Sequence, residues 1–458
     1  METREFLGTE PIKKLILRLS IPTVAAQLIN LLYNLVDRIY IGHIAEDGAL
    51  ILTGVGVCMP VILVVSAFAG LVGSGGAPRA SILLGRKEHD QAEEILGECA
   101  AALVILAVIL PAVLLLFSRP LLLLFGASAN TIGYALSYMN IYAAGTIFVQ
   151  LTLGLNMFIT AQGFVRESMF SVLIGAVLNI VLDPILIFAF HMNAAGAALA
   201  TIISQAVSCF YVLKFLTGRK TALRLRKKNL HLRPGVILPC LALGSAAFIM
   251  QATESVIQVC FNSSLLKYGG DLAVGSMTIL SSVLQFVMLP VHGFSQGAQP
   301  ILSYNYGAGN TGRVKEAFWF LLKISLGYTV CFCGLVLLFP RVPIALFTTS
   351  GQLLDYAAAK LRIYILGMTI FGIQITIQCI FTSLGKAASA IMVASMRKLI
   401  LLVPFIYLFP AILPGLLSVD QATAVFMAEP AADVLSVLFA CFMFAFTFRS
   451  GVGVPLKK

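Results

Sequence analysis

The chain has 458 residues, of which 59% are hydrophobic and only 11% are charged, with a formal net charge of +11. An ordinary soluble domain is about 45–50% apolar and about 25% charged, so this composition excludes a water-soluble globular protein. A mean hydropathy of +0.96 instead favours a chain that crosses a membrane many times, because each crossing needs about 20 mostly apolar residues.

Long apolar segments recur along the whole chain and predict an all-α integral membrane protein with twelve transmembrane helices. The first of them is not a secretory signal peptide, because the run from Leu15 to Ile44 is longer than the roughly 7–15 apolar residues of such a signal and contains Asn30, Asn34 and Asp37. The expected helices cover residues 15–42, 48–76, 92–117, 132–161, 167–190, 195–217, 236–266, 272–303, 314–339, 353–384, 387–413 and 421–447.

The two halves of the chain match each other at a nearly constant offset. A shift of 222 residues aligns Gly145 with Gly367, and a shift of 217 residues aligns the intramembrane acids Asp37 and Glu254. Because each half has six helices, both halves have the same orientation and form parallel repeats. We therefore expect two pseudo-symmetric six-helix bundles around a central cleft: an N-lobe at 1–216, a basic cytoplasmic linker at 217–235 and a C-lobe at 236–458.

The distribution of Lys and Arg predicts the orientation of the chain. If the termini and the loops after even-numbered helices share one side, that side receives 25 of the 31 basic residues, including Arg397 and Lys398 near the start of the eleventh helix. Cytoplasmic loops carry such an excess, so both termini are expected in the cytoplasm. The basic linker favours contact with anionic membrane lipids over binding of nucleic acid.

The first helix carries a line of polar residues, Thr23, Gln27, Asn30, Asn34 and Asp37, spaced by 4, 3, 4 and 3 positions. This spacing puts all five on one helix face, which must contact protein or water, because exposure to lipid costs several kcal/mol per group. The alternative for the amides is hydrogen bonding between helices. An acid at this depth costs about 2.5–3.5 kcal/mol even on a lenient scale, which favours a functional role for Asp37.

A second polar group lies on the fifth helix, where Asn179 and Asp183 are one turn apart and Pro184 cannot donate a hydrogen bond to the carbonyl of Ile180. The hydroxyl of Thr201 can add another oxygen. If Asp183 is considered alone, a role in a helix kink or cap is the alternative. We expect a proton or sodium site at Asp37, Asn179, Asp183 and Thr201, with no other metal and no cofactor.

The second half lacks an equivalent cluster. Aligning Pro184 with Pro404 sets Val403 against Asp183, so the eleventh helix offers no acid. Ion coupling is therefore assigned to the N-lobe, and Glu254 is a second acidic site that can pair with a cationic substrate. Because intramembrane charges are usually paired, we expect three further charges to neutralise one another: Arg397, Glu429 and Asp433.

Aromatic rings can bind flat organic cations through their faces, and amides can orient them. On this basis the expected residues of the substrate cleft are Asn30, Tyr33, Asn34, Tyr138, Asn156, Phe158 and Gln251. The glycine-rich runs 70–76 and 293–297 are interpreted as close helix contacts and not as phosphate loops, because no Gly-Lys-Ser/Thr follows them.

The sequence resembles the multidrug and toxic compound extrusion (MATE) family, in particular its MepA-like branch. The resemblance rests on five motifs: Leu32–Arg38 with Ile41–His43, Asn179–Phe188, Gly196–Thr201, Gly297–Pro300 and Asn305–Ala308. It implies two six-helix lobes and export of cationic amphipathic drugs by alternating access, in exchange for inward protons or sodium ions.

The resemblance also carries over to single residues. It implies that Asp37, Asn179, Asp183 and Thr201 match the cation site of the family's N-lobe, and Glu254 resembles the acid on the seventh helix of some branches. The acid that other branches carry on the tenth helix is absent, since the polar residues there are Gln374 and Gln378.

Two other functions fit a protein of this class. A flippase for lipid-linked oligosaccharides shares the two-lobe architecture, but anionic headgroups would need several Arg or Lys in the cleft, and the helix midsections carry few. A receptor or structural protein without a transport cycle leaves the buried acids unexplained. No nucleophile–base pattern indicates an enzyme. We expect a monomer in the cell membrane whose partners are small cationic drugs and lipids.

Overall fold

The computed structural model describes residues 6–44, 48–348 and 350–449. Within these residues every regular element is a helix. The first group comprises α1 (Phe6–Thr9), α2 (Ile12–Gly42), α3 (Gly48–Gly85), α4 (His89–Leu124), α5 (Ile132–Ala144), α6 (Thr146–Ala161), α7 (Val165–Pro184), the π-helix η2 (Ile185–Ala189) and α8 (Asn193–Thr217).

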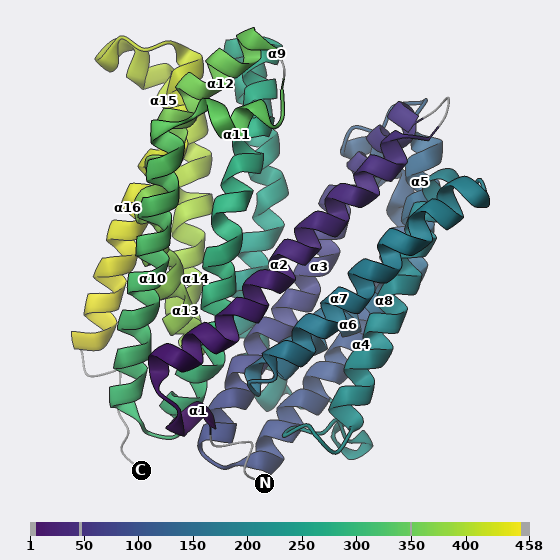
Figure 1. Cartoon of the computed structure of the whole chain (residues 1–458), viewed down its shortest axis with the longest axis vertical. Helices are drawn as coiled ribbons and strands as arrows, with labels where there is room; N and C mark the ends of the chain where they lie inside the picture. The colour runs from purple at the N-terminus through teal and green to yellow at the C-terminus, as the bar shows by residue number, and fades with distance from the viewer. Residues whose placement is uncertain (1–5, 45–47, 349, 450–458) are drawn as a thin grey trace.

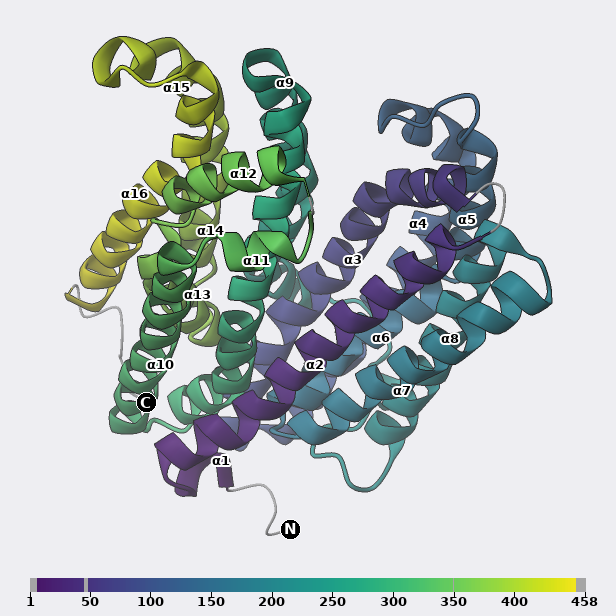
Figure 2. The ribbon, with the colours of Figure 1, turned by 45° about the horizontal axis from the view of Figure 1, so that its top comes forward.

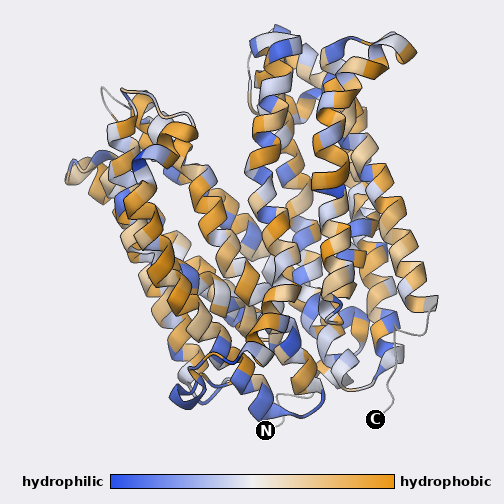
Figure 3. Ribbon diagram, turned by 180° about the vertical axis from the view of Figure 1, so that it is seen from behind, coloured by the Kyte–Doolittle hydropathy of each residue, from blue (hydrophilic) through white to orange (hydrophobic). Residues whose placement is uncertain are grey.

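After the short 3₁₀-helix η3 (Lys227–Asn229), a second group follows. It comprises α9 (Pro234–Gly307), α10 (Thr311–Leu338), α11 (Arg341–Ala345), α12 (Gly351–Tyr364), α13 (Met368–Ser383), α14 (Ala387–Ser395), the π-helix η4 (Met396–Leu402), α15 (Val403–Leu417) and α16 (Gln421–Arg449). Figure 3 shows hydrophobic residues along the length of these helices and hydrophilic residues gathered at the loops near the termini.

The prediction of twelve membrane-spanning helices is confirmed. In the described part of the chain, nine helices are long and apolar enough to cross a membrane, and two bent helix pairs raise this number to eleven. The twelfth arises because α9 is broken at Gly270, whose φ of 63° only glycine adopts readily. The expected seventh and eighth helices are therefore joined directly at this residue, without the separate loop that we expected.

The bent pairs occupy matching places in the two repeats. The α5–α6 pair bends by 57° at Gly145, and the α12–α13 pair bends by 49° next to Gly367. A Cβ on Gly145 would lie 2.3 Å from the side chain of Ile202, and one on Gly367 would lie 2.5 Å from that of Asp433. Both bends thus need a residue without a side chain at the helix contact.

Two lobes separate toward one end of the molecule and converge at the end that holds both termini (Figures 1 and 2). At the converging end, α3 packs on α9 through glycines. A Cβ on Gly75 would lie 1.8 Å from the carbonyl oxygen of Cys240, and one on Gly244 would lie 1.8 Å from that of Leu71. The predicted role of the glycine-rich run in close helix contact is confirmed at Gly75.

The first helix of each repeat begins in the core of the opposite lobe. Leu15 and Leu19 of α2 are buried in one cluster with Phe381 of α13, and α2 then runs diagonally to the far end of the N-lobe (Figure 1). In the same way, Cys240 near the start of α9 is buried in a cluster with Leu96 of α4. This exchange ties the two lobes together near the termini.

Candidate functional site

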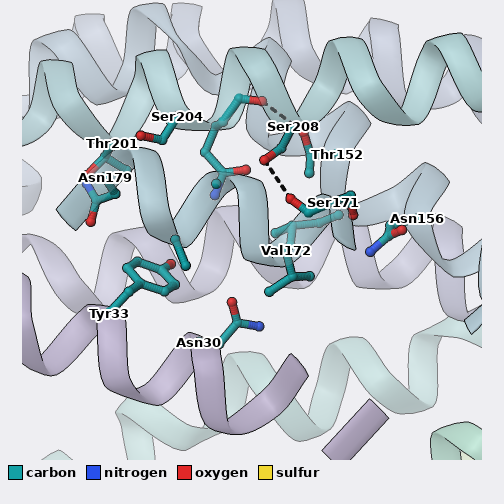
Figure 4. A pocket seen from close by; sticks show the side chains of 14 residues that line it. Asn30, Tyr33, Thr152, Asn156, Ser171, Val172, Asn179, Thr201, Ser204 and Ser208 are labelled. Carbon is teal, nitrogen blue, oxygen red and sulfur yellow. Dashed lines mark hydrogen bonds between the residues drawn. The ribbon is translucent and has the colours of Figure 1, made fainter. Parts of the chain in front are cut away.

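A polar pocket lies inside the N-lobe between α2, α6, α7 and α8 (Figure 4). Asn30 and Tyr33 of α2 point toward the polar residues of the other three helices in this view. The pocket walls are tied by side-chain hydrogen bonds, for example from the Ser208 hydroxyl to the carbonyl oxygen of Ser171 at 2.9 Å. Small side chains, most of them polar, thus line a space in a lobe whose other contacts are mostly apolar.

The four predicted cation-site residues lie together at one side of this pocket. The side-chain amide of Asn179 donates to Oδ1 of Asp183 at 3.3 Å and to the hydroxyl of Thr201 at 3.5 Å. Asp37 reaches the cluster from α2, close enough for its carboxyl group to interact directly with that of Asp183. The side chains of Asp37, Asn179 and Asp183 are buried, so α2 and α7 bring these groups together away from bulk water.

Three oxygens of the cluster have no hydrogen-bond donor: Oδ1 of Asp37, Oδ1 of Asn179 and Oδ2 of Asp183. Buried polar atoms are normally paired, and two buried carboxylates also repel each other. The arrangement therefore provides oxygen ligands and negative charge for a proton or a small cation. Oxygen atoms of this kind are also the ligand atoms that Na⁺, a hard cation, prefers.

Pro184 shapes the backbone next to this cluster. It ends α7, and the following residues form the π-helix η2, in which the amide of Phe190 donates to the carbonyl of Ile185 at 3.0 Å. Single π-helical turns are rare and occur often at functional sites. The proline therefore lies at a change of helix type between Asp183 and Ile185, which the sequence did not predict.

The C-lobe contains a buried ionic cluster of a different kind. The Nε atom of Arg397 lies 2.7 Å from Oδ1 of Asp433, and an NH2 atom of the same guanidinium lies 2.6 Å from Oε1 of Glu429. The guanidinium also lies 4.5 Å from the ring centre of Phe371. These distances agree with the expectation that the three charges neutralise one another.

Lys398 is the residue that the sequence analysis misplaced. We counted Arg397 and Lys398 with the cytoplasmic loops, but both side chains are buried within the candidate span 387–417. The Lys398 ammonium bonds Glu254 and also donates to the carbonyl oxygen of Met250 at 2.6 Å. Glu254 therefore has a resident positive partner, which the apolar sequence around Lys398 could have indicated because an isolated membrane lysine needs an acid.

The comparison with known families decides the class of the chain. The model of the family MatE matches residues 22–185 and again residues 246–408, so it covers most of both halves. The chain belongs to the MatE family.

Relatives of this MatE protein are similar over most of their length. It is 27% identical to the "Multidrug export protein MepA" of Staphylococcus haemolyticus (strain JCSC1435), with 83% of each chain covered. It is also 27% identical to the protein of the same name from Staphylococcus aureus (strain NCTC 8325 / PS 47), with 89% of each chain covered. The chain is thus a MepA-like member of the family.

A solved structure shows the same fold. The "Outward-facing conformation of a multidrug resistance MATE family transporter of the MOP superfamily" superposes with a TM-score of 0.90, covers 100% of both chains and is 21% identical in sequence. The two-lobe helical architecture of this MatE protein is therefore shared with that transporter.

The predicted substrate residues of this MatE protein separate into three groups. Asn30, Tyr33 and Asn156 line the N-lobe pocket. Asn34 is exposed on α2 and donates to the carbonyl oxygen of Asn30 at 2.6 Å. Gln251 is half-buried, and its side-chain oxygen approaches Gly70 of α3 at the inner faces of the lobes.

Two of the predicted cleft residues are buried in the core instead. Phe158 is fully buried, and its ring fills the space next to Gly76 of α3. Tyr138 is also buried, with its hydroxyl near Thr201. Neither side chain lines the pocket. When a helix is packed on several sides, an aromatic side chain points into the core, whichever residues flank it in the sequence.

Proposed function

We propose that this protein exports cationic amphipathic drugs across the cell membrane, driven by an inward flow of protons or sodium ions. The observation that carries the proposal is the buried pair Asp37 and Asp183 with the amide of Asn179. Three unpaired oxygens in this cluster favour uptake of a positive ion. Release of the ion leaves two neighbouring carboxylates in a poorly solvated site. Their repulsion and desolvation favour a conformational change of the N-lobe.

The substrate pocket shares residues with this ion site. Asn179 and Thr201 belong to both, and Tyr33 lies in the pocket four residues before Asp37. A bound ion and a bound cationic drug therefore compete electrostatically, because both gain from the same two carboxylates. Such competition is the physical basis of antiport, and the names of the MepA relatives support a drug as the exported molecule.

The arrangement of the lobes supports alternating access. The lobes separate at the end far from the termini (Figures 1 and 2). The excess of Lys and Arg in the loops at the termini supports a cytoplasmic position for both ends of the chain. With that orientation the molecule opens to the outside, and the similar MATE transporter structure is likewise an outward-facing conformation. We further propose a monomer that needs lipids but no cofactor and no nucleic acid.

The decisive experiment measures efflux of a fluorescent organic cation from proteoliposomes under a proton gradient and, separately, a sodium gradient. Asp37→Asn keeps the size of the side chain but removes its charge, so gradient-driven efflux is expected to fall to the level of empty liposomes. Asp355→Asn is the matched control, because Asp355 is exposed and pairs with Arg341 far from the pocket. Transport by Asp37→Asn at the wild-type rate under both gradients would contradict the proposal.

A further inference from the structure

The linker between the lobes is fixed on the start of α4. A Cβ on Gly97 would lie 2.5 Å from the carbonyl oxygen of Asn229, so the two backbones touch. Glu93 accepts a hydrogen bond from the backbone N–H of Arg224 at 3.2 Å and forms an ion pair with Arg226 at 2.8 Å. The linker is therefore part of the folded N-lobe over these residues.

Next to this contact, Glu94 and Glu98 lie one helical turn apart and face His231 of the linker. The Nε2 atom of His231 is 3.8 Å from Oε1 of Glu98 and 4.0 Å from Oε1 of Glu94, and the ligand atoms of all three side chains lie within 4.8 Å of one another. These distances are too long for hydrogen bonds. The side chains approach one another without being directly bonded.

The innermost of these groups are buried and lack partners. The side chain of Glu98 is 0% exposed, and its Oε1 atom accepts no hydrogen bond, while its Oε2 atom accepts one from the backbone N–H of Arg233 at 3.1 Å. The Nε2 atom of His231 is likewise buried and unpaired. A buried carboxylate oxygen and a buried imidazole nitrogen that face each other without a hydrogen bond can share one ion between them.

We propose that Glu94, Glu98 and His231 bind a divalent transition-metal ion, with zinc as the best fit. Zinc bonds to carboxylate oxygen and imidazole nitrogen are about 2.0–2.2 Å long and usually tetrahedral, so two ligand atoms of one ion lie about 3.3–3.6 Å apart. The gaps of 3.8 and 4.0 Å are wider than this by roughly half an ångström, which small rotations of the side chains can close. Glu94 is 25% exposed and can rotate to close the remaining separation between the two carboxylates.

The charges around the site determine how tightly it binds. Arg233 bonds Oε1 of Glu94 at 2.5 Å, but its own side chain is 62% exposed and can turn into water when a metal binds. Lys228 lines the same surface hollow, together with Asp90. The two basic side chains oppose a divalent cation, so the site is expected to fill when zinc is raised and not to hold it permanently.

The test uses the full-length protein in detergent after treatment with a chelator. Zinc is titrated in competition with a chromophoric chelator, and one equivalent per chain is expected. Glu98→Gln and His231→Gln should each weaken binding at least about tenfold, which is about 1.4 kcal/mol. Arg233→Gln should strengthen it, because it removes the opposing charge. His89→Gln is the matched control, since His89 lies on the first turn of α4 but outside the cluster.

Zinc should also raise the unfolding temperature of the wild type and of His89→Gln, but not that of His231→Gln. Should Glu98→Gln fail to fold, His231→Gln decides the question, because the His231 side chain is 35% exposed and tolerates replacement more readily. Absence of stoichiometric binding, or binding that is unchanged in His231→Gln, would overturn the proposal.

Discussion

At the scale of single residues, the two lobes use intramembrane charge in opposite ways. The N-lobe cluster around Asp37 and Asp183 has unpaired oxygens, and its residues contribute no positive side chain within it. In the C-lobe, Arg397 lies between two acids, and Lys398 bonds Glu254. A resident ammonium occupies the place that a transported cation would need, which supports our proposal that ion coupling belongs to the N-lobe.

Lys398 therefore limits what Glu254 can bind. The Glu254 side chain is 58% exposed and can meet a cationic substrate, but it must share its charge with the buried ammonium. Replacing the lysine by Lys398→Met should lower the KM for a monovalent cationic drug by up to about tenfold, about 1.4 kcal/mol. The measurement is the concentration dependence of efflux in proteoliposomes. Lys398→Arg keeps the charge and should leave the KM close to that of the wild type, whereas an equal fall in KM for both variants would contradict this role.

Arg397, next to Lys398, has a structural role, because it neutralises two buried acids. Its removal in Arg397→Ala leaves Glu429 and Asp433 buried without a partner, and loss of one member of a buried pair typically costs about 3–5 kcal/mol. We expect a strongly lowered unfolding temperature in detergent. Arg341→Ala serves as control, because the Arg341 side chain is 71% exposed in its pair with Asp355, and exposed pairs contribute about 0–1 kcal/mol.

At the scale of elements, glycines decide how closely helices approach. Gly75→Ala would place a methyl group 1.8 Å from the carbonyl oxygen of Cys240, so α3 and α9 would have to move apart. Overpacking of this kind costs about 1–3 kcal/mol, and we expect a lower unfolding temperature and slower efflux. The control is Gly56→Ala on the same helix, where a Cβ meets nothing within 4 Å and the change should be neutral or stabilising. Equal stability of the two variants would show that this contact does not constrain the helices.

The helices and their contacts also show which structural features can be predicted from the sequence and which cannot. The apolar runs predict all twelve spans, because each must cross the same thickness of hydrocarbon. The one-turn spacing of Asn179 and Asp183 places them on the same helix face, and Asp37, which the sequence also assigns to this site, approaches them from α2. The apolar sequence around Lys398 indicates that it needs an acidic partner, but which acid it contacts, and the burial of Phe158, depend on tertiary packing. The contact of His231 with α4 likewise depends on how the linker folds back.

At the scale of the whole molecule, the proposed alternating access requires the lobes to move relative to each other. At the converging end, the side-chain amide of Gln27 on α2 bonds that of Gln296 on α9 at 3.1 Å. A disulfide between Gln27→Cys and Gln296→Cys should hold this end closed and stop efflux, with recovery after reduction. Efflux of the oxidised double variant at the wild-type rate would argue against rocking of the lobes. Each single cysteine variant, treated with the same oxidant, controls for the nine native cysteines.

The exchange of helix ends between the lobes has a consequence for biosynthesis. The apolar side chains Leu7, Leu15 and Leu19 are buried in one cluster with Phe318 and Phe381, which leave the ribosome about 300 residues or more later. During translation, the apolar start of α2 therefore lacks the residues on which it finally packs while α3 to α9 are inserted into the membrane. The N-lobe cannot reach its final packing before the C-lobe is made, so maturation of the protein ends with the closure of this shared core and not with two independent folding steps.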